Sequence, residues 1–174
     1  MRTAIFSLVA AGLMVVGCTQ TAESGDAGAD VAATDTTERN KRLAREFYEN
    51  LWFSNNTSVY ADYVADEYVV HDLGERKNVT EQAIEQKNIA DFFHGMGTMT
   101  GEMDYQIAEG DMVANRWWLS LSDISEQGQA MGMQPFERVA IINVFRFNEE
   151  GKIVEIWNHR HDVELPRPPE RHDA

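Results

Sequence analysis

The stretch VFRFNEEGKIVEIWN, residues 144–158, decides the fold. Its two halves are rich in β-branched and aromatic residues, and Asn148-Glu-Glu-Gly151 between them is a turn sequence. This pattern predicts two antiparallel strands joined by a short loop. A second turn at Gly110-Asp111 and a mobile loop at 125–135 complete a predicted set of four strands, at 103–109, 112–124, 136–147 and 152–161.

Towards the N-terminus the pattern changes from strands to helices. Leu43, Phe47 and Leu51 recur at helical spacing, in a helix that begins at Thr36 or Thr37 and continues through residue 53. Helices followed by antiparallel strands indicate the α+β class, with the helices packed on one face of a curved sheet. Three further segments are predicted between them: a short helix at 58–65, a β-rich segment at 67–72 and a helix at 79–94 with an Asn78-x-x-Glu81 capping box.

The composition is that of one globular domain with accessory segments. The chain has 174 residues, of which 43% are hydrophobic and 25% charged. Its 29 acidic and 15 basic residues give a formal net charge of −14, which argues against nucleic acid or an anionic membrane surface as the main partner. The lone cysteine, Cys18, excludes an internal disulfide and a cysteine-based zinc cluster.

The N-terminus has the layout of a secretory signal. Arg2 precedes an apolar run that is too short for a confident membrane span, and the run ends in Val15-Val16-Gly17-Cys18. This ending resembles the lipobox of bacterial lipoproteins, in which residues 1–17 would be removed and the thiol of Cys18 would carry a diacylglycerol. The alternative is an ordinary signal peptide with an incidental cysteine.

The lipobox resemblance implies a domain organisation and a location. Residues 18–34 are small, polar and acidic and are predicted to form a flexible tether, residues 35–163 the folded domain, and residues 164–174 a proline-rich extended tail. Because Thr19 rather than aspartate follows the cysteine, the resemblance implies a lipid anchor in the bacterial outer membrane, facing the periplasm.

Four segments, in this order, resemble the SnoaL-like polyketide cyclase family of the nuclear transport factor 2-like superfamily over residues 37–163. The resemblance implies a cone-shaped α+β barrel, in which a curved, mostly antiparallel sheet wraps around three N-terminal helices and encloses a pocket. It also implies homodimers through the outer sheet face, and cofactor-free aldol, isomerase, dehydratase or hydrolase chemistry on small apolar molecules. The segments are EFYENLW (46–52), VADEYVVHD (64–72), AEGDMVANRWWLS (108–120) and VFRFNEEGKIVEIWN (144–158).

The candidate catalytic residues follow from that resemblance. The closing strand of the family often reads Ile-Val-Glu-His-Trp-Asp, with the aspartate as base, and the matching histidine and aspartate positions here are Ile156 and Asn158. An amide cannot abstract a proton near pH 7, but it can donate a hydrogen bond to a developing enolate oxygen. His71 matches a histidine of relatives and is an acid/base candidate, or alternatively a residue that caps a strand end.

Three further residues are predicted to contact the ligand: Trp118, Asn143 and Ile156. Arg116 and Trp118 alternate onto one face of a strand and Trp117 onto the other, so one indole is expected to line the cone and the other the outer face, with core packing as the alternative for either. Asn143 is a polar residue within an apolar strand and needs a hydrogen-bond partner, which ligand or backbone could supply.

We expect no metal and no cofactor. His159 and His161 share a face with Glu164 nearby, but solvated histidines at a sheet edge are the more common outcome of this pattern. The sequence contains no nucleophile elbow, phosphate loop or dinucleotide fingerprint.

Two functions therefore stay open. The first is an envelope-anchored, cofactor-free enzyme that acts on a small, largely apolar carbonyl compound, with His71 as acid or base and Asn158 positioning an oxygen. The second is a non-catalytic lipoprotein that binds a small ligand in the same pocket, or a partner on the outer sheet, because the polar positions of the family are replaced by Ile156 and Asn158.

Overall fold

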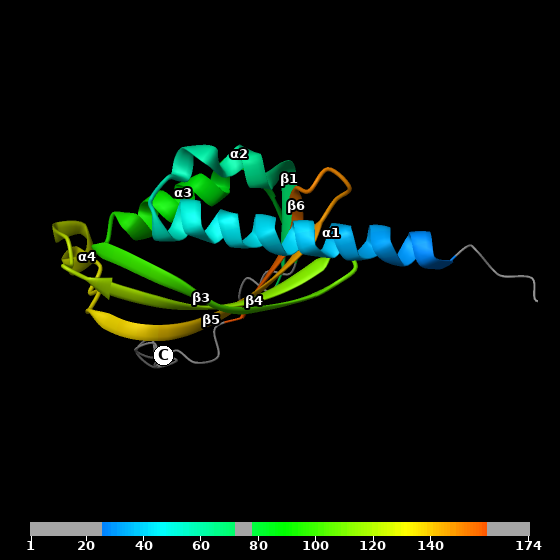
Figure 1. The fold of residues 1–174 in the computed structure, drawn as a ribbon. Helices are drawn as coiled ribbons and strands as arrows, with labels where there is room; N and C mark the ends of the chain where they lie inside the picture. Colours follow the sequence, from blue (N-terminus) through cyan, green and yellow to red (C-terminus); the bar gives the residue numbers. More distant parts are fainter. Residues whose placement is uncertain (1–25, 72–77, 160–174) are drawn as a thin grey trace, which may run out of the picture.

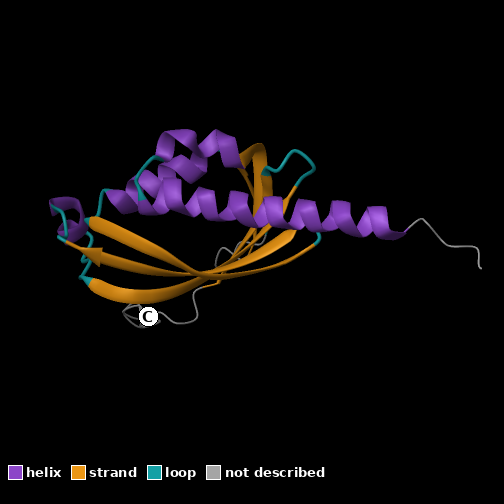
Figure 2. Cartoon of the chain, in the orientation of Figure 1, coloured by secondary structure: helices purple, strands orange, loops and turns teal. Residues whose placement is uncertain are grey.

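The computed structural model describes residues 26–71 and 78–159, with side chains described from 35 to 71 and from 78 to 158. The described chain contains helices and strands in one α+β arrangement (Figure 1 and Figure 2). In chain order the elements are α1 (Asp26–Phe47), the π-helical turn η1 (Tyr48–Phe53), the 3-10 turn η2 (Thr57–Val59), α2 (Tyr60–Tyr63), β1 (Val64–His71), β2 (Val79–Gln82), α3 (Ile84–His94), β3 (Thr98–Glu109), β4 (Met112–Ser122), α4 (Glu126–Ala130), β5 (Phe136–Phe147) and β6 (Ile153–His159).

The strands form one six-stranded sheet in the order β2-β1-β6-β5-β4-β3. All neighbours are antiparallel except β1 and β6, which pair in parallel. The sheet is curled but unclosed, and α1, α2 and α3 lie on one side of it, while α4 lies beyond the ends of the long strands (Figure 1). The predicted α+β class, with helices packed in a curved, mostly antiparallel sheet, is confirmed.

The alternation along β4 defines the two faces of this sheet. Val113, Asn115 and Trp117 are buried, whereas the residues between them are partly exposed. We call the face that packs against α1 and η1 the concave face, and the opposite one the convex face. This period of two is what a sheet with only one covered face requires.

Aromatic side chains fill much of the concave side. Phe47, Tyr48 and Phe145 are each 1% exposed, and the rings of Tyr48 and Phe145 stack with centroids 5.4 Å apart. The indole of Trp117 lies 5.0 Å from the Tyr48 ring. Since each such side chain buries 150–250 Å², these contacts account for a large part of the hydrophobic stabilisation.

The first helix begins earlier than predicted, at Asp26 rather than at Thr36 or Thr37. The added residues, DAGADVAATD, include several alanines, which have the highest helix propensity, and carry acidic residues near the positive end of the helix dipole. The helix thus extends into the range assigned to the tether. At its other end it becomes the π-helical turn η1.

The prediction of a single helix over 79–94 was wrong in its first turn. Residues 79–82 form strand β2, which pairs with β1, and the helix α3 begins only at Ile84. Asn78 has φ of 56°, which is the left-handed region rather than the extended conformation of a helix N-cap. The carboxylate of Glu81 accepts a hydrogen bond from Tyr68 at 2.5 Å instead of closing a capping box.

The remaining boundaries differ by smaller amounts. β1 and β3 begin before the predicted strands, at Val64 and Thr98. The predicted loop 125–135 contains the helix α4, whose N-cap Ser125 accepts from the backbone N–H of Gly128. Both predicted turns hold a glycine in the left-handed region, Gly110 at φ 58° and Gly151 at φ 81°.

Several predictions fall outside the described residues: the signal peptide, Cys18 with the lipobox, residues 164–174, and His161 with Glu164. His159 ends β6, but its side chain is not described. In the described part of the chain, no helix is both long and apolar enough to span a bilayer.

Candidate functional site

Asn143 is the centre of a polar cluster on the concave face. It lies on β5, is 7% exposed, and its Oδ1 accepts hydrogen bonds from the Tyr48 hydroxyl at 2.7 Å and from Trp117 Nε1 at 2.8 Å. Its Nδ2 donates to Asn158 Oδ1 at 2.5 Å. We call Tyr48, Trp117, Asn143 and Asn158 the amide relay. Its polar groups satisfy one another in an otherwise apolar interior, as buried polar groups must.

Strand register and a helix irregularity bring these residues together. Asn143 on β5 lies directly opposite Asn158 on β6, so their side chains share a face. Trp117 on β4 pairs with Ile141, two residues before Asn143 on the same face. Tyr48 is the first residue of the π-helical turn η1, and such turns occur often at functional sites.

Burial controls the protonation of the relay. Desolvation raises the pKa of the Tyr48 phenol well above its ordinary value of 10.0, and the neighbouring indole N–H of Trp117 opposes this only in part. The phenol is therefore protonated at neutral pH and donates its hydrogen bond. It acts as an anchor for Asn143 and not as a base.

Asn158 is the member of the amide relay that reaches the solvent. Its side chain is partly exposed, unlike those of Tyr48, Trp117 and Asn143. Ile156, also predicted from the sequence, lies on the same face but is 3% exposed and packs opposite Phe145 as part of the core.

His71 lies on the convex face. Its ring stacks on Trp157 with centroids 4.2 Å apart, Nε2 contacts Glu155 Oε2 at 2.6 Å and Nδ1 contacts Asn78 Oδ1 at 2.8 Å. Trp157 and Asn158 are consecutive on β6 and so point to opposite faces. The structure therefore does not bring the two predicted catalytic residues, His71 and Asn158, together.

Trp118 also lies on the convex face. Its ring is flanked by the guanidinium groups of Arg116 at 4.3 Å and Arg138 at 4.6 Å. The expectation that one tryptophan lines the cone and the other the outer face holds, but the inner one is Trp117, which is 3% exposed. The prediction of Trp118 as a contact of a ligand inside the cone does not fit this placement, because strand alternation turns neighbouring residues apart.

Sequence reasoning missed Tyr48 and selected Trp118 in place of Trp117. In the sequence analysis Tyr48 stood only within the segment EFYENLW (46–52), without a role of its own. A usable signal was present: an amide inside an apolar strand needs partners, and the donors available to Asn143 include a phenol and an indole from other elements.

A second polar cluster joins β1, β2 and α3. The Tyr68 hydroxyl donates to Glu81 Oε2 at 2.5 Å and accepts from Gln86 Nε2 at 2.7 Å. Burial raises the pKa of this phenol, and the hydrogen bond to the Glu81 carboxylate adds to the increase. Because Tyr68 is 1% exposed, the cluster secures β2 and α3 and does not form a reactive site.

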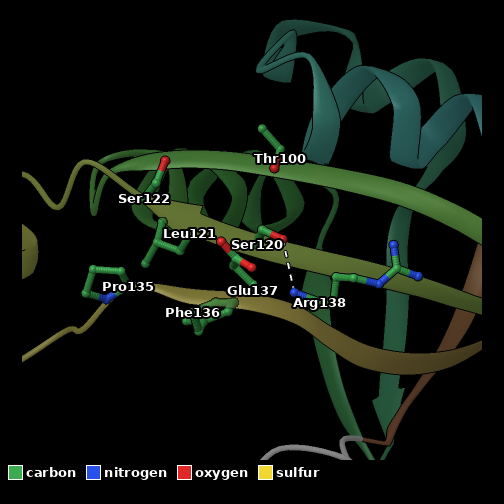
Figure 3. A pocket seen from close by; sticks show the side chains of 8 residues that line it. All are labelled: Thr100, Ser120, Leu121, Ser122, Pro135, Phe136, Glu137 and Arg138. Carbon is green, nitrogen blue, oxygen red and sulfur yellow. Dashed lines mark hydrogen bonds between the residues drawn. The ribbon is translucent and has the colours of Figure 1, made fainter.

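A groove lies near α4, where the strands β3 and β5 begin and β4 ends (Figure 3). Its volume is about 570 Å³, and it contains no residue of the amide relay. The backbone N–H of Arg138, a residue with φ of 53°, donates to Ser120 Oγ at 3.1 Å in its floor. The lining residues are Thr100, Ser120, Leu121, Ser122, Pro135, Phe136, Glu137 and Arg138.

The described residues include no group of three or more His, Cys, Asp or Glu side chains able to hold a metal ion. Asn115, the other fully buried amide of the sheet, accepts from Gln106 Nε2 at 2.8 Å and donates to the carbonyl of Val113. It lies opposite Asn143 in the β4–β5 register, but its hydrogen bonds are separate from the amide relay.

Comparison with solved structures places this fold among known proteins. SalBIII, described as an epoxide hydrolase/cyclase-like enzyme in pyran ring formation in the polyether salinomycin, is 15% identical with a TM-score of 0.56, over 72% of this chain and 94% of that one. The IdmH 96-104 loop truncation variant is 20% identical with a TM-score of 0.54, over 69% and 91%. Bal32a, from a soil-derived mobile gene cassette, is 16% identical with a TM-score of 0.55, over 73% and 92%.

These likenesses establish the fold. A search of curated proteins found no significant match. The family model described as SnoaL-like polyketide cyclase matches residues 42–167, which is more than half of the chain and includes every residue of the amide relay. The chain therefore belongs to the SnoaL-like polyketide cyclase family.

Proposed function

We propose that the domain is a cofactor-independent enzyme of the cyclase or isomerase type, which binds a small, largely apolar carbonyl compound on the concave face beside Asn158. One observation carries the proposal: a partly exposed amide is held in a fixed position by a buried polar relay, within an aromatic surround. Family membership and the fold shared with SalBIII support it.

The chemistry follows from what the amide can do. Asn158 donates a hydrogen bond to the carbonyl oxygen and stabilises the negative charge that develops there on enolisation or ring closure. A donor of this kind contributes on the order of 3 kcal/mol in a water-poor site. Asn158 does not abstract the proton, and His71, on the convex face, is not positioned to do so, so a water molecule beside the partly exposed side chain of Asn158 accepts the α-proton.

Turnover is the test of this proposal. The purified protein is incubated with a library of small ketones and polyketide-like compounds, and products are detected by mass spectrometry. The proposal requires at least one conversion that falls about 100-fold or more in Asn158→Leu but not in His71→Gln. A conversion that depends on His71 and not on Asn158 would refute the site.

A second candidate function is favoured by one specific feature: an amide, Asn158, occupies the base position of the family. In this alternative the protein binds the carbonyl compound without converting it. A small molecule that co-purifies unchanged with the wild-type protein and is lost from Asn158→Leu, with no conversion in the library, supports binding alone.

We also propose that Cys18 anchors the protein in the outer membrane through a lipid, with the domain in the periplasm. The support is the sequence Val15-Val16-Gly17-Cys18 after an apolar run. Cells that express the chain are labelled with radioactive palmitate. The wild type is expected to take up label and to fractionate with the outer membrane, and Cys18→Ala to lose both.

A homodimer through the convex face is proposed on the family resemblance. Tyr105 and Ile107 on β3 are 50% and 65% exposed, which leaves apolar surface for a second copy. Light scattering of the wild type and of Ile107→Glu tests this, with a dimer expected only for the wild type.

A further inference from the structure

The hydrogen bonds of the amide relay run in one direction from donor to acceptor, and Trp117 determines this direction. An indole Nε1–H can only donate a hydrogen bond, so the atom of Asn143 at 2.8 Å from Trp117 Nε1 has to be the carbonyl oxygen Oδ1. The protonated phenol of Tyr48 donates to the same oxygen at 2.7 Å. The amide of Asn143 therefore cannot be turned around without placing its NH₂ group against the N–H of Trp117, whereas the Tyr48 hydroxyl can rotate and accept.

The orientation of Asn143 passes to Asn158. With Oδ1 held by Trp117 and Tyr48, Asn143 presents its Nδ2 to Asn158, at 2.5 Å from Asn158 Oδ1. The oxygen of Asn158 thus faces Asn143, so its own Nδ2 lies on the other side of the amide group. Among the described residues, no acceptor contacts this Nδ2, and the Asn158 side chain is partly exposed.

We propose that Trp117, acting through Asn143, fixes Asn158 as a hydrogen-bond donor, so that the site selects ligands that present an acceptor oxygen, such as a ketone or an enolate. This specificity rests on the proposed binding of an apolar carbonyl compound beside Asn158. Trp117 and Asn143 are positioning residues, because neither of them needs to touch the ligand.

The substitution Asn143→Asp inverts the direction with almost no change in size. A carboxylate accepts hydrogen bonds on both oxygens, so Tyr48 and Trp117 keep their acceptor, but Asn158 now has to turn its Nδ2 towards residue 143. Its Oδ1 then points outward. Donors on both sides favour the ionised carboxylate, and the measurements are made at pH 8 to keep it charged.

The first readout needs no ligand. The side-chain NH₂ of Asn158 is assigned by NMR and its hydrogen exchange with solvent is measured in the wild type and in Asn143→Asp. We expect exchange at Asn158 to slow by about tenfold in the variant, because its NH₂ gains the hydrogen bond it lacked. Unchanged or faster exchange in a folded Asn143→Asp protein would overturn the proposal.

Two variants control for this result. Asn115→Asp makes the same change at the other buried amide of the sheet, outside the amide relay, and is expected to leave the exchange at Asn158 within about twofold of the wild type. Trp117→Phe removes the residue that determines the direction and keeps the ring. If Asn143→Asp does not fold, Trp117→Phe decides the case, since it should slow exchange at Asn158 by populating the reversed orientation, and an unaltered rate would refute the proposal.

The second readout uses three bicyclic probes of one shape: 1-tetralone, 1-tetralol and tetralin. Their dissociation constants are measured by quenching of tryptophan fluorescence. We expect the preference for tetralone over tetralin to fall by about tenfold from the wild type to Asn143→Asp, while the preference for tetralol, which can also donate, changes by less than about threefold. Equal losses for ketone and alcohol would contradict the inference.

The two proposals fail in different ways. If none of the three probes binds to the wild type, the proposed carbonyl site is contradicted, whereas the exchange measurement still decides the direction of the amide relay. If the probes bind but their ranking is insensitive to Asn143→Asp, the carbonyl site stands and the inference about donor selection fails.

Discussion

Removing Asn143 Oδ1, the acceptor at the centre of the amide relay, should destabilise the protein, because two buried donors then lack a partner. Asn143→Leu keeps the approximate size of the side chain but leaves the Tyr48 hydroxyl and the Trp117 Nε1–H without their acceptor in the core. A buried donor left unpaired costs about 1–3 kcal/mol. Two of them therefore cost about 2–6 kcal/mol, a large share of the stability of an ordinary domain.

The assay is a double-mutant cycle with Tyr48→Phe. In the wild-type background this substitution removes a satisfied hydrogen bond and should cost roughly 1 kcal/mol. In the Asn143→Leu background it removes an unpaired buried hydroxyl and should cost nothing or stabilise the protein. The coupling between the two sites should therefore lie on the order of 1–3 kcal/mol.

Urea unfolding followed by circular dichroism measures the four proteins, with the slope m compared to confirm the same extent of unfolding. Asn143→Leu should lower the melting temperature by roughly 3–5 °C for each kcal/mol lost. The reasoning is refuted if Tyr48→Phe costs the same free energy in both backgrounds, because the hydroxyl would then not depend on Asn143.

Three further outcomes follow from the same geometry. His71→Gln should leave the dissociation constant of 1-tetralone within about twofold of the wild type, because His71 and its partner Glu155 lie on the convex face. The lost contact should cost about 1 kcal/mol of stability. A large loss of binding on titration would contradict that placement. Asn158→Asp puts a carboxylate at the base position of the family. It should speed the exchange of the α-protons of 1-tetralone with D₂O, measured by NMR, by about 100-fold or more. An unchanged rate with the probe bound would show that residue 158 is not aligned for proton abstraction. The raised pKa of Tyr48 favours the protonated phenol in the folded state, so its contribution to stability is complete below pH 10.0, the ordinary value, and is lost as the pH rises towards the folded-state pKa. Tyr48→Phe should flatten this decline in the free energy of unfolding at alkaline pH, measured by urea unfolding. An equal decline in both proteins would rule out Tyr48 as its source.

Local sequence patterns were sufficient to predict the secondary structure of the long, regular strands. The strands β4 and β5 were predicted within two residues because both are long segments rich in β-branched and aromatic residues, next to turn sequences. Short elements lacked such a signal. The four residues of β2 read equally well as the first turn of a helix, and they become a strand only because β1 offers them hydrogen-bond partners.

The candidate site was predicted in part for a similar reason. Asn143 was selected as a polar residue within an apolar strand and Asn158 by its match to the family's base position, and they do contact each other. His71 and Trp118 were selected by resemblance and by residue type, without knowledge of the face on which each would lie. A displacement by one residue moves a side chain to the other side of a sheet, so register decides such assignments.

The sequence by itself determined the fold class, the order of the long strands along the chain, the turns at Gly110 and Gly151, and the presence of an amide, Asn158, where the family resemblance implies a base. These features depend on composition and on contacts between near neighbours in the chain. Only the tertiary structure decided that Tyr48 and Trp117 meet at Asn143, and that His71 and Asn158 lie on opposite faces. The reason is physical: the direction of the amide relay arises from donors on η1 and β4 and an acceptor on β6, and these come together only when the sheet curls around the helices.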